Sequence, residues 1–97
     1  MARYRLFSEA KDELEAGVSF YESEHPGLGQ DLAIEVRRLI RMIVDSPYAG
    51  LEVRPGIRRR ILRRFPYSIL YTIENEDILV IAIAHQSRRP GYWHGRV

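Results

Sequence analysis

The feature of this 97-residue sequence that most constrains its fold is a change in apolar spacing about halfway along the chain. Between residues 8 and 45 apolar side chains recur every three or four positions, the spacing of one face of an α-helix. Between residues 57 and 84 they recur at every second position or run without interruption, which is typical of β-strands. This order predicts an α+β fold, with a helical hairpin packed on one face of a sheet.

Two helices are predicted in the first half of the chain. The first follows Ser8, a residue type that caps helix N-termini, and it ends at the His-Pro-Gly sequence of residues 25–27. The second begins near residues 29–31 and ends at the Asp-Ser-Pro sequence of residues 45–47. Because only a few residues join them, the two helices are expected to form an antiparallel hairpin.

Four strands are predicted, at residues 3–7, 57–64, 67–73 and 78–84. Residues 48–56, which contain two glycines and a proline, are expected to form a loop. The last strand is apolar almost throughout and fits a buried central position. The expected architecture is one domain over residues 1–97, with a mostly antiparallel sheet of about four strands. The first strand can join this sheet beside the last one, and the sequence leaves the strand order open.

Composition excludes several classes of protein. The absence of cysteine rules out disulfides, thiolate chemistry and cysteine-based zinc sites, and three scattered histidines suggest no metal site and no cofactor. No segment approaches the roughly 20 apolar residues that span a membrane. The N-terminus lacks the apolar core of a signal peptide, so the expected location is the cytoplasm, without membrane association.

The net charge of +2 conceals an uneven distribution along the chain. Residues 1–53 carry six basic and ten acidic side chains, whereas residues 54–97 carry nine arginines and three carboxylates. Arginine binds carboxylates and phosphates through two parallel hydrogen bonds. The second half therefore predicts contact with an anionic partner, either a nucleic acid or an acidic protein segment.

Four segments of the second half form a recognisable pattern. They are Ile57-Arg58-Arg59, Arg-Arg-Phe-Pro-Tyr-Ser-Ile-Leu-Tyr at residues 63–71, Ile-Ala-Ile-Ala-His at residues 81–85, and Arg-Arg-Pro-Gly-Tyr-Trp-His-Gly-Arg at residues 88–96. Together they resemble the RelE/ParE superfamily of toxins from type II toxin–antitoxin systems, and the ParE branch more than the RelE branch. In the first half, Tyr21-Glu22 before Gly27-Leu28-Gly29, and Glu35 beyond them, are similar to the helical hairpin of these toxins.

The resemblance covers nearly the whole chain and implies a strand–helix–helix–three-strand fold. It also implies a growth-inhibiting toxin of the kind found in plasmid stabilization systems. A cognate antitoxin, encoded by an adjacent gene, would neutralise it in a toxin–antitoxin hetero-oligomer.

Three functions follow from this resemblance, and the sequence leaves them open. A ParE-like protein would poison DNA gyrase and would not be an enzyme. A RelE-like protein would cleave mRNA on the ribosome as an endoribonuclease. A third alternative is a non-toxic member that binds its partner and helps it to repress their operon.

Candidate site residues differ between these functions. A nuclease would draw on Arg64, His85, Arg88 and Tyr92, because arginine can hold a phosphate while histidine and tyrosine transfer protons. Two of them also have a structural interpretation: His85 can form local hydrogen bonds that fix the C-terminal residues, and Arg64 belongs to the strand arginines of residues 58–64, one or two of which are expected to be structural.

Contact with the target or the antitoxin is expected from Arg59, Arg63, Arg89, Trp93 and Arg96. For Trp93 the alternative is packing of the C-terminal residues against the core. After residue 53 carboxylates occur only at Glu74, Glu76 and Asp77, and the single lysine is on the first helix. This scarcity favours the ParE-like function.

The strand arginines at residues 58–64 are expected to divide between the two faces of the sheet. Those that face the helices need carboxylate partners such as Glu35 or Glu22, because an unpaired buried charge is costly. One or two of them are therefore expected to be structural. The others, with Arg88, Arg89 and Arg96, are expected to form an exposed basic surface.

Overall fold

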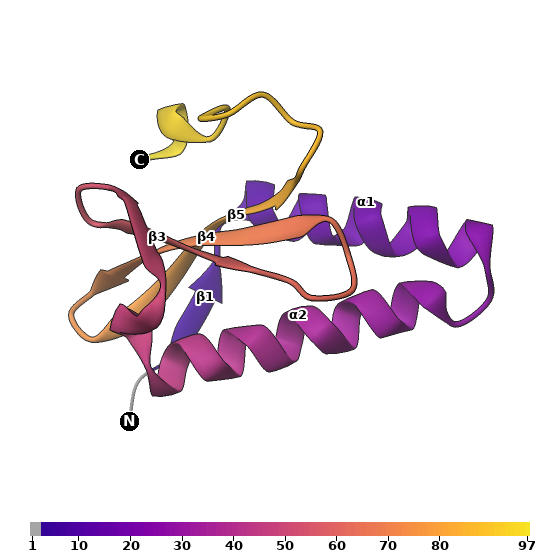
Figure 1. Cartoon of the computed structure of the whole chain (residues 1–97), viewed down its shortest axis with the longest axis horizontal. Coiled ribbons are helices and arrows are strands. Elements are labelled where there is room, and N and C mark those ends of the chain that lie inside the picture. The colour runs from indigo at the N-terminus through magenta and orange to yellow at the C-terminus, as the bar shows by residue number, and fades with distance from the viewer. Residues whose placement is uncertain (1–2) are drawn as a thin grey trace.

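The computed structural model describes residues 3–97 and shows a five-stranded sheet with a helical hairpin on one face (Figure 1). In chain order the elements are β1 (Tyr4–Leu6), α1 (Ser8–Glu24), α2 (Leu28–Asp45), the 3-10 helix η1 (Pro47–Ala49), β2 (Leu51–Arg54), β3 (Ile57–Ile61), β4 (Tyr67–Glu74), β5 (Asp77–His85) and the 3-10 helix η2 (His94–Arg96).

The strand order is β1-β5-β4-β3-β2, and every neighbouring pair is antiparallel except β1 and β5, which are parallel. The predicted α+β class is confirmed, and β1 does join the sheet beside β5. The sheet has five strands rather than about four.

The two helices approach each other closely at Gly29. A Cβ atom at this position would lie 2.4 Å from the carbonyl oxygen of Val18 on α1, so only glycine fits without displacement. The carboxylate of Glu22 accepts the backbone N–H groups of Gly27 and Gly29, at 2.8 Å and 3.0 Å, and so satisfies two amides at the start of α2. The prediction that Ser8 caps α1 is wrong, because Ser8 is the first helical residue and no side chain caps this end.

Apolar side chains pack on both faces of the sheet. The larger cluster joins the helical hairpin to one face of β4 and β5, with Tyr71, Ile69 and Val80 among its fully buried members. A smaller cluster on the opposite face contains Ile57, Leu70, Ile81, Ala82 and Trp93. In Figure 1, α2 runs below the sheet, and the yellow C-terminal segment, residues 86–97, lies above it.

A bulge explains why β5 lacks strict alternation. Leu70 pairs with Ala82 and Tyr71 pairs with Val80, so Ile81 is an extra residue on β5. As a result Ile81 and Ala82, although consecutive, belong to the same apolar cluster. Both faces of β5 are covered, as expected for an apolar central strand.

Two predicted boundaries around β3 are wrong. Residues 48–56 were expected to form a loop but contain part of η1 and the edge strand β2, whose four residues are all exposed. An edge strand without a buried face has no apolar alternation to reveal it. The predicted strand at 57–64 ends at Ile61, because Leu62 turns into the core and Glu35 accepts the amides of Arg63 and Arg64.

None of the helices in residues 3–97 combines the length and apolar composition needed to cross a membrane.

Candidate functional site

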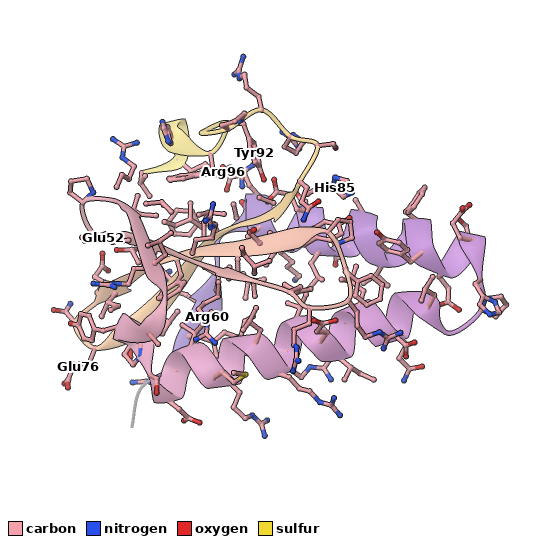
Figure 2. All side chains as sticks on the ribbon, viewed as in Figure 1. Glu52, Arg60, Glu76, His85, Tyr92 and Arg96 are labelled. Atoms are coloured by element: carbon pink, nitrogen blue, oxygen red, sulfur yellow. The ribbon has the colours of Figure 1, made fainter. Side chains whose placement is uncertain are left out.

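The arginine triplet of β3 is divided between the two faces of the sheet. Arg58 and Arg60 lie opposite Tyr71 and Ile69, which belong to the cluster between the sheet and the helices. Arg59 lies opposite Leu70, which belongs to the cluster on the other face. Since paired residues of neighbouring strands share a face, Arg58 and Arg60 lie on the helix side and Arg59 on the opposite side. Figure 2 shows Arg60 next to α2 and remote from Tyr92.

Arg58 has the structural role expected of one or two strand arginines, but not the expected partner. Its guanidinium donates to the carbonyl oxygens of Tyr48 and Gly50, at 3.1 Å and 2.8 Å, and lies over the Tyr48 ring. The expected pairing of strand arginine side chains with Glu35 or Glu22 is wrong, because both carboxylates accept backbone amides instead. The carbonyls of a turn satisfy Arg58 in place of a carboxylate.

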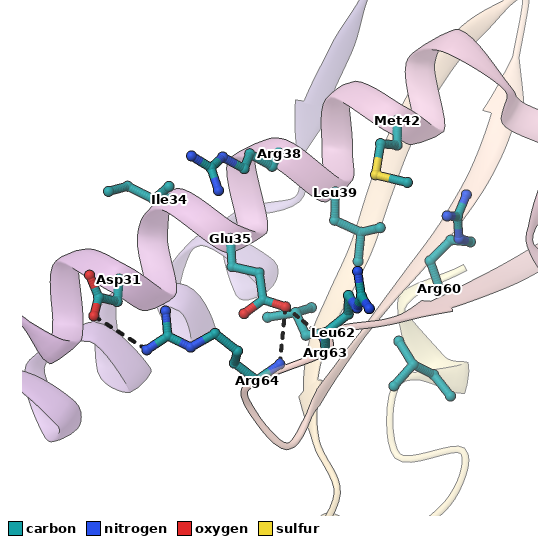
Figure 3. A pocket seen from close by; sticks show the side chains of 11 residues that line it. Asp31, Ile34, Glu35, Arg38, Leu39, Met42, Arg60, Leu62, Arg63 and Arg64 are labelled. Atoms are coloured by element: carbon teal, nitrogen blue, oxygen red, sulfur yellow. Dashed lines mark hydrogen bonds and ion pairs between the residues drawn. The ribbon is translucent and has the colours of Figure 1, made fainter.

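One groove, which we call the α2–β3 groove, lies between α2 and the end of β3 (Figure 3). Its volume is about 730 Å³, and it is lined by Asp31, Ile34, Glu35, Arg38, Leu39, Met42, Arg60, Ile61, Leu62, Arg63 and Arg64. Its lining includes the apolar side chains of Ile34, Leu39, Met42, Ile61 and Leu62, and Met42 and Ile61 are about half exposed (52% and 55%). Of its four arginines, only Arg64 pairs with a carboxylate among the described residues, at 3.5 Å from Asp31. This groove therefore combines exposed apolar surface with unpaired positive charge.

A second groove, which we call the tail groove, lies on the opposite face of the sheet beneath residues 86–97. Its volume is about 360 Å³, and it is lined by Val53, Arg59, Ser68, Leu70, Ala84, His85, Gln86, Arg88, Arg89, Pro90, Gly91, Tyr92, Trp93 and His94. Among residues 3–97, three arginines and two histidines line it, and no carboxylate does. The positive charge of the tail groove thus suits an anionic partner.

His85 ends β5 at the edge of the tail groove. Its Nδ1 accepts the backbone N–H of Ser87 at 3.0 Å and lies 2.8 Å from the Ser87 hydroxyl oxygen. Because Nδ1 acts as an acceptor for that amide, the neutral ring carries its proton on Nε2. The ring also makes an edge contact with Tyr67. These contacts fix the first turn of the C-terminal segment and leave Nε2 as the nitrogen that remains for a partner.

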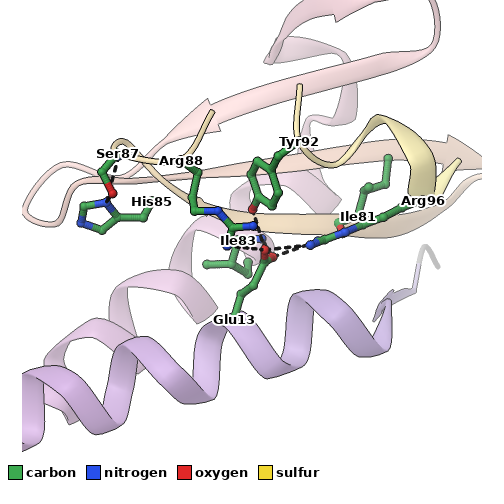
Figure 4. Close-up of polar contacts among 8 residues, drawn as sticks. All are labelled: Glu13, Ile81, Ile83, His85, Ser87, Arg88, Tyr92 and Arg96. Carbon is green, nitrogen blue, oxygen red and sulfur yellow. Dashed lines mark hydrogen bonds and ion pairs between the residues drawn. The ribbon is translucent and has the colours of Figure 1, made fainter. Parts of the chain in front are cut away.

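Tyr92 does not face the tail groove with a free hydroxyl. The hydroxyl donates to Glu13 Oε2 at 2.6 Å, and Arg96 binds the same carboxylate through both Nη atoms, at 3.0 Å and 2.9 Å (Figure 4). Burial, together with the hydrogen bond to the Glu13 carboxylate, raises the pKa of Tyr92 well above its usual range. A tyrosine held in this way is a poor proton donor or acceptor near neutral pH.

Burial disfavours the charged form of Glu13, but the hydrogen bonds from Arg96, Tyr92 and the Ile83 amide outweigh this effect. The pKa of Glu13 therefore lies below its ordinary value. The bond to Glu13 in turn raises the pKa of Arg96. Both charges are present throughout the physiological pH range.

The structure brings together only part of the predicted site. Arg59, His85, Arg88, Arg89, Tyr92 and Trp93 all line the tail groove, whereas Arg63 and Arg64 line the α2–β3 groove. The predicted nuclease set is therefore divided, with Arg64 on a different groove from His85, Arg88 and Tyr92.

Two residues predicted to form a contact surface are largely covered. Trp93 is 6% exposed and packs in the smaller apolar cluster, so its side chain holds the C-terminal segment to the sheet. The side chain of Arg96 was expected on the exposed basic surface but is only 15% exposed, in the ion pair with Glu13. Trp93 and Arg96 both contact β5, the most buried strand, and these contacts remove most of their side-chain surface from solvent.

Sequence reasoning missed Glu13, Arg38 and His94, and it did not single out Arg60 among the strand arginines. Arg38 and Arg60 join the α2–β3 groove from α2 and β3, and His94 joins the tail groove from η2. Glu13 resembled any exposed acid of an amphipathic helix, and its partner Arg96 is 83 residues away. Its one sequence signal was its position directly before Leu14, which lies on the apolar face of the helix. This position is compatible with partial burial. No group of three or more metal-ligating side chains is assembled within residues 3–97.

Comparison with protein families matches residues 4–90 to the ParE toxin of the type II toxin–antitoxin system parDE. The chain belongs to the ParE toxin family. The predicted membership of the RelE/ParE superfamily, closer to ParE, is thereby confirmed. No match was found among curated proteins.

Solved structures support the same fold. A chain of the chromosomal ParDE toxin–antitoxin system from P. aeruginosa superposes with a TM-score of 0.76 at 20% identity, covering 88% of this ParE family chain and 96% of that chain. The isolated RelE toxin of E. coli gives a TM-score of 0.67 at 16% identity, covering 98% and 95%. An arginine double mutant of E. coli RelE in complex with an antitoxin RelBc peptide gives 0.66 at 16% identity, covering 97% and 93%.

Proposed function

We propose that this ParE family protein is a toxin that inhibits growth by acting on DNA gyrase in the cytoplasm, and that a cognate antitoxin neutralises it. The observation that carries this proposal is the match of residues 4–90 to the ParE toxin family. The charge of the tail groove supports it, because three arginines without a lining carboxylate suit an anionic protein or protein–DNA surface.

The dispersal of the predicted nuclease residues also favours a gyrase poison. Tyr92 donates its hydroxyl to Glu13, and Arg64 lies on the other groove. A general acid or base must reach the reacting proton within hydrogen-bond distance. The four predicted residues could surround one phosphate only if the C-terminal segment and the turn after β3 both moved.

A second candidate function is cleavage of mRNA in the manner of RelE. It is favoured by one observation, which is that His85 and His94 line the tail groove together with Arg59, Arg88 and Arg89. Two imidazoles can serve as acid and base while arginines hold the phosphate. This set differs from the predicted one, since His94 takes the place of Tyr92, and Arg59 and Arg89 take the place of Arg64.

Expression of the toxin without its antitoxin, followed by paired readouts of DNA and mRNA, separates the candidates. We expect double-strand DNA breaks and an SOS response with intact mRNA. Cuts in ribosome-bound mRNA with intact DNA would refute gyrase as the target and favour His85 and His94 as the reacting groups. A chain without any effect on growth would instead be a partner-binding co-repressor.

For the antitoxin we propose the α2–β3 groove as the docking site of an acidic amphipathic helix. Its lining runs from Asp31 to Met42 along α2, a length of about 16 Å, which accommodates roughly three helical turns. The apolar side chains of the lining suit the apolar face of such a helix, and Arg38, Arg60 and Arg63 suit its carboxylates. A nucleic acid backbone would leave the half-exposed Met42 and Ile61 without a partner.

Neighbouring arginines on opposite faces of β3 provide a matched test of this division. We expect Arg60→Glu to weaken binding to the antitoxin of the co-expressed pair at least about tenfold while growth inhibition persists, because one repulsive contact replaces an attractive one. Arg59→Glu should do the reverse. Equal loss of both activities in both variants would contradict separate docking sites.

A further inference from the structure

The C-terminal segment, residues 86–97, is attached to the rest of the protein almost entirely by side chains. Gln86 donates its N–H to the carbonyl of Pro66, but the later backbone hydrogen bonds stay within residues 85–97. They form successive turns, for example from Tyr92 N to Arg89 O and from Arg96 N to Trp93 O. The position of this segment over the sheet is therefore set by what its side chains bind.

Glu13 of α1 is the polar attachment point of the segment (Figure 4). The Glu13 side chain is 13% exposed. Its carboxylate accepts hydrogen bonds from the Tyr92 hydroxyl and from both Nη atoms of Arg96, and its Oε1 also accepts the backbone N–H of Ile83 at 3.0 Å. Arg96 donates in addition to the carbonyl oxygen of Ile81 at 3.1 Å. One carboxylate thus joins α1, β5 and the C-terminal segment.

The short length of β1 explains why these groups meet. β1 pairs with residues 78–80 of β5, and the last bond along this edge is from Phe7 N to Val80 O. Beyond Val80 no strand of the described part of the chain lies beside the backbone groups of β5 on that edge. A buried amide or carbonyl without a partner is costly. Glu13 and Arg96 satisfy the Ile83 amide and the Ile81 carbonyl in place of a longer β1.

The same contacts reach a guanidinium of the tail groove. The guanidinium of Arg88 stacks on the Tyr92 ring at 3.9 Å from its centre and lies 3.9 Å from Glu13 Oε2. The Arg88 side chain is about half exposed, so it remains accessible to a partner. The Tyr92 ring that supports it is held in turn by Glu13.

We propose that Glu13 is a positioning residue of the tail groove, which acts through Tyr92 and Arg96 to set the place and orientation of Arg88 and its neighbours. Glu13 contacts no partner itself in this role. The expected effect on growth rests on the proposed function of the tail groove as the target-binding surface. The expected effect on the C-terminal segment does not depend on it.

Glu13→Gln tests the proposal with almost unchanged side-chain volume. Amide hydrogen exchange of the purified chain should accelerate about tenfold or more across residues 86–97, because loss of hydrogen bonds to a charged group shifts an opening equilibrium by roughly that factor. Exchange in α2 and β3 should stay unchanged. Glu15→Gln, at an exposed position of the same helix, is the matched control and should alter neither exchange nor growth inhibition.

Tyr92→Phe provides a second, milder variant in case Glu13→Gln folds poorly. It keeps the ring under Arg88 and removes only the hydroxyl, so exchange across residues 86–97 should rise less than in Glu13→Gln. Growth inhibition in cells without antitoxin should fall in the same order as exchange rises.

Three results would separate failure of this inference from failure of the proposed function. Unchanged exchange at residues 86–97 in Glu13→Gln would overturn the positioning role. Acceleration spread evenly over the whole chain would also overturn it, in favour of a general contribution to stability. Acceleration confined to residues 86–97 with undiminished growth inhibition would uphold the positioning role and overturn the tail groove as the target-binding surface.

Discussion

Replacement of Trp93 by alanine distinguishes the two roles that the sequence suggested for this residue. Trp93 is 6% exposed and packs against Ile57, Leu70, Ile81 and Ala82 on the face of the sheet remote from the helices. Truncation of a buried tryptophan to alanine typically costs about 3–5 kcal/mol. Here the loss of unfolding free energy is limited, because residues 86–97 can detach from the sheet. The loss then cannot exceed the free energy with which this segment binds the sheet. We therefore expect a loss of about 3 kcal/mol, at the lower end of that range.

This loss is measured by urea denaturation of the isolated chain, monitored by circular dichroism, and thermal unfolding provides a second measurement. For a domain of this size each kcal/mol lowers Tm by about 4–8 °C, so Trp93→Ala should melt about 12 °C or more below the parent. Phe20→Ala is the control, because Phe20 is 57% exposed and should change the unfolding free energy by less than about 1 kcal/mol. An unchanged unfolding free energy in Trp93→Ala, combined with lost growth inhibition, would refute the packing role and make Trp93 a target contact.

Two further predictions concern stability. Because the pKa of Glu13 lies below its ordinary value in the folded chain, its charge stabilises the fold above the unfolded-state pKa, and this contribution disappears as the pH falls through the folded-state pKa. The unfolding free energy of the parent should thus fall toward that of Glu13→Gln between about pH 5 and pH 3, and a constant difference over this range would contradict the assignment. Gly29→Ala should destabilise the chain by about 1–3 kcal/mol in the same urea assay, because the clash with the Val18 carbonyl outweighs a gain of up to about 1 kcal/mol in helix propensity. Gly95→Ala, where a Cβ meets no atom within 4 Å, is the control, and equal stability of the two variants would show that the helices can separate without cost.

The fold was largely predictable because its elements have strong local signals. The apolar spacing of residues 8–45 predicted both helices, and the alternation of residues 67–73 with the apolar run that follows predicted β4 and β5. Burial against one neighbour imposes a period on the sequence, so it can be read without the structure. The edge strand β2 is buried on neither face and therefore left no such period.

The candidate site was only partly predictable. The arginine and aromatic residues of the C-terminal half predicted that the site lies there. Most residues of the tail groove come from residues 85–96, which the family resemblance had already indicated. The sequence could not show that Arg64 would lie apart from His85, because Leu62 turns into the core and redirects the chain after Ile61. It also could not separate Trp93 as packing from Trp93 as a contact.

What the sequence determined by itself about this ParE family protein is the order of its two helices and of strands β1, β3, β4 and β5, its family, and the alternation of Arg58, Arg59 and Arg60 between two faces. Which of the two faces packs against α2 was decided only by tertiary packing, because Tyr71 and Ile69 belong to the apolar cluster shared with the helical hairpin. Tertiary packing also decided the pairing of Glu13 with Arg96. Local spacing records whether a residue is buried, whereas the partner of a charge depends on which distant backbone groups the fold leaves unsatisfied.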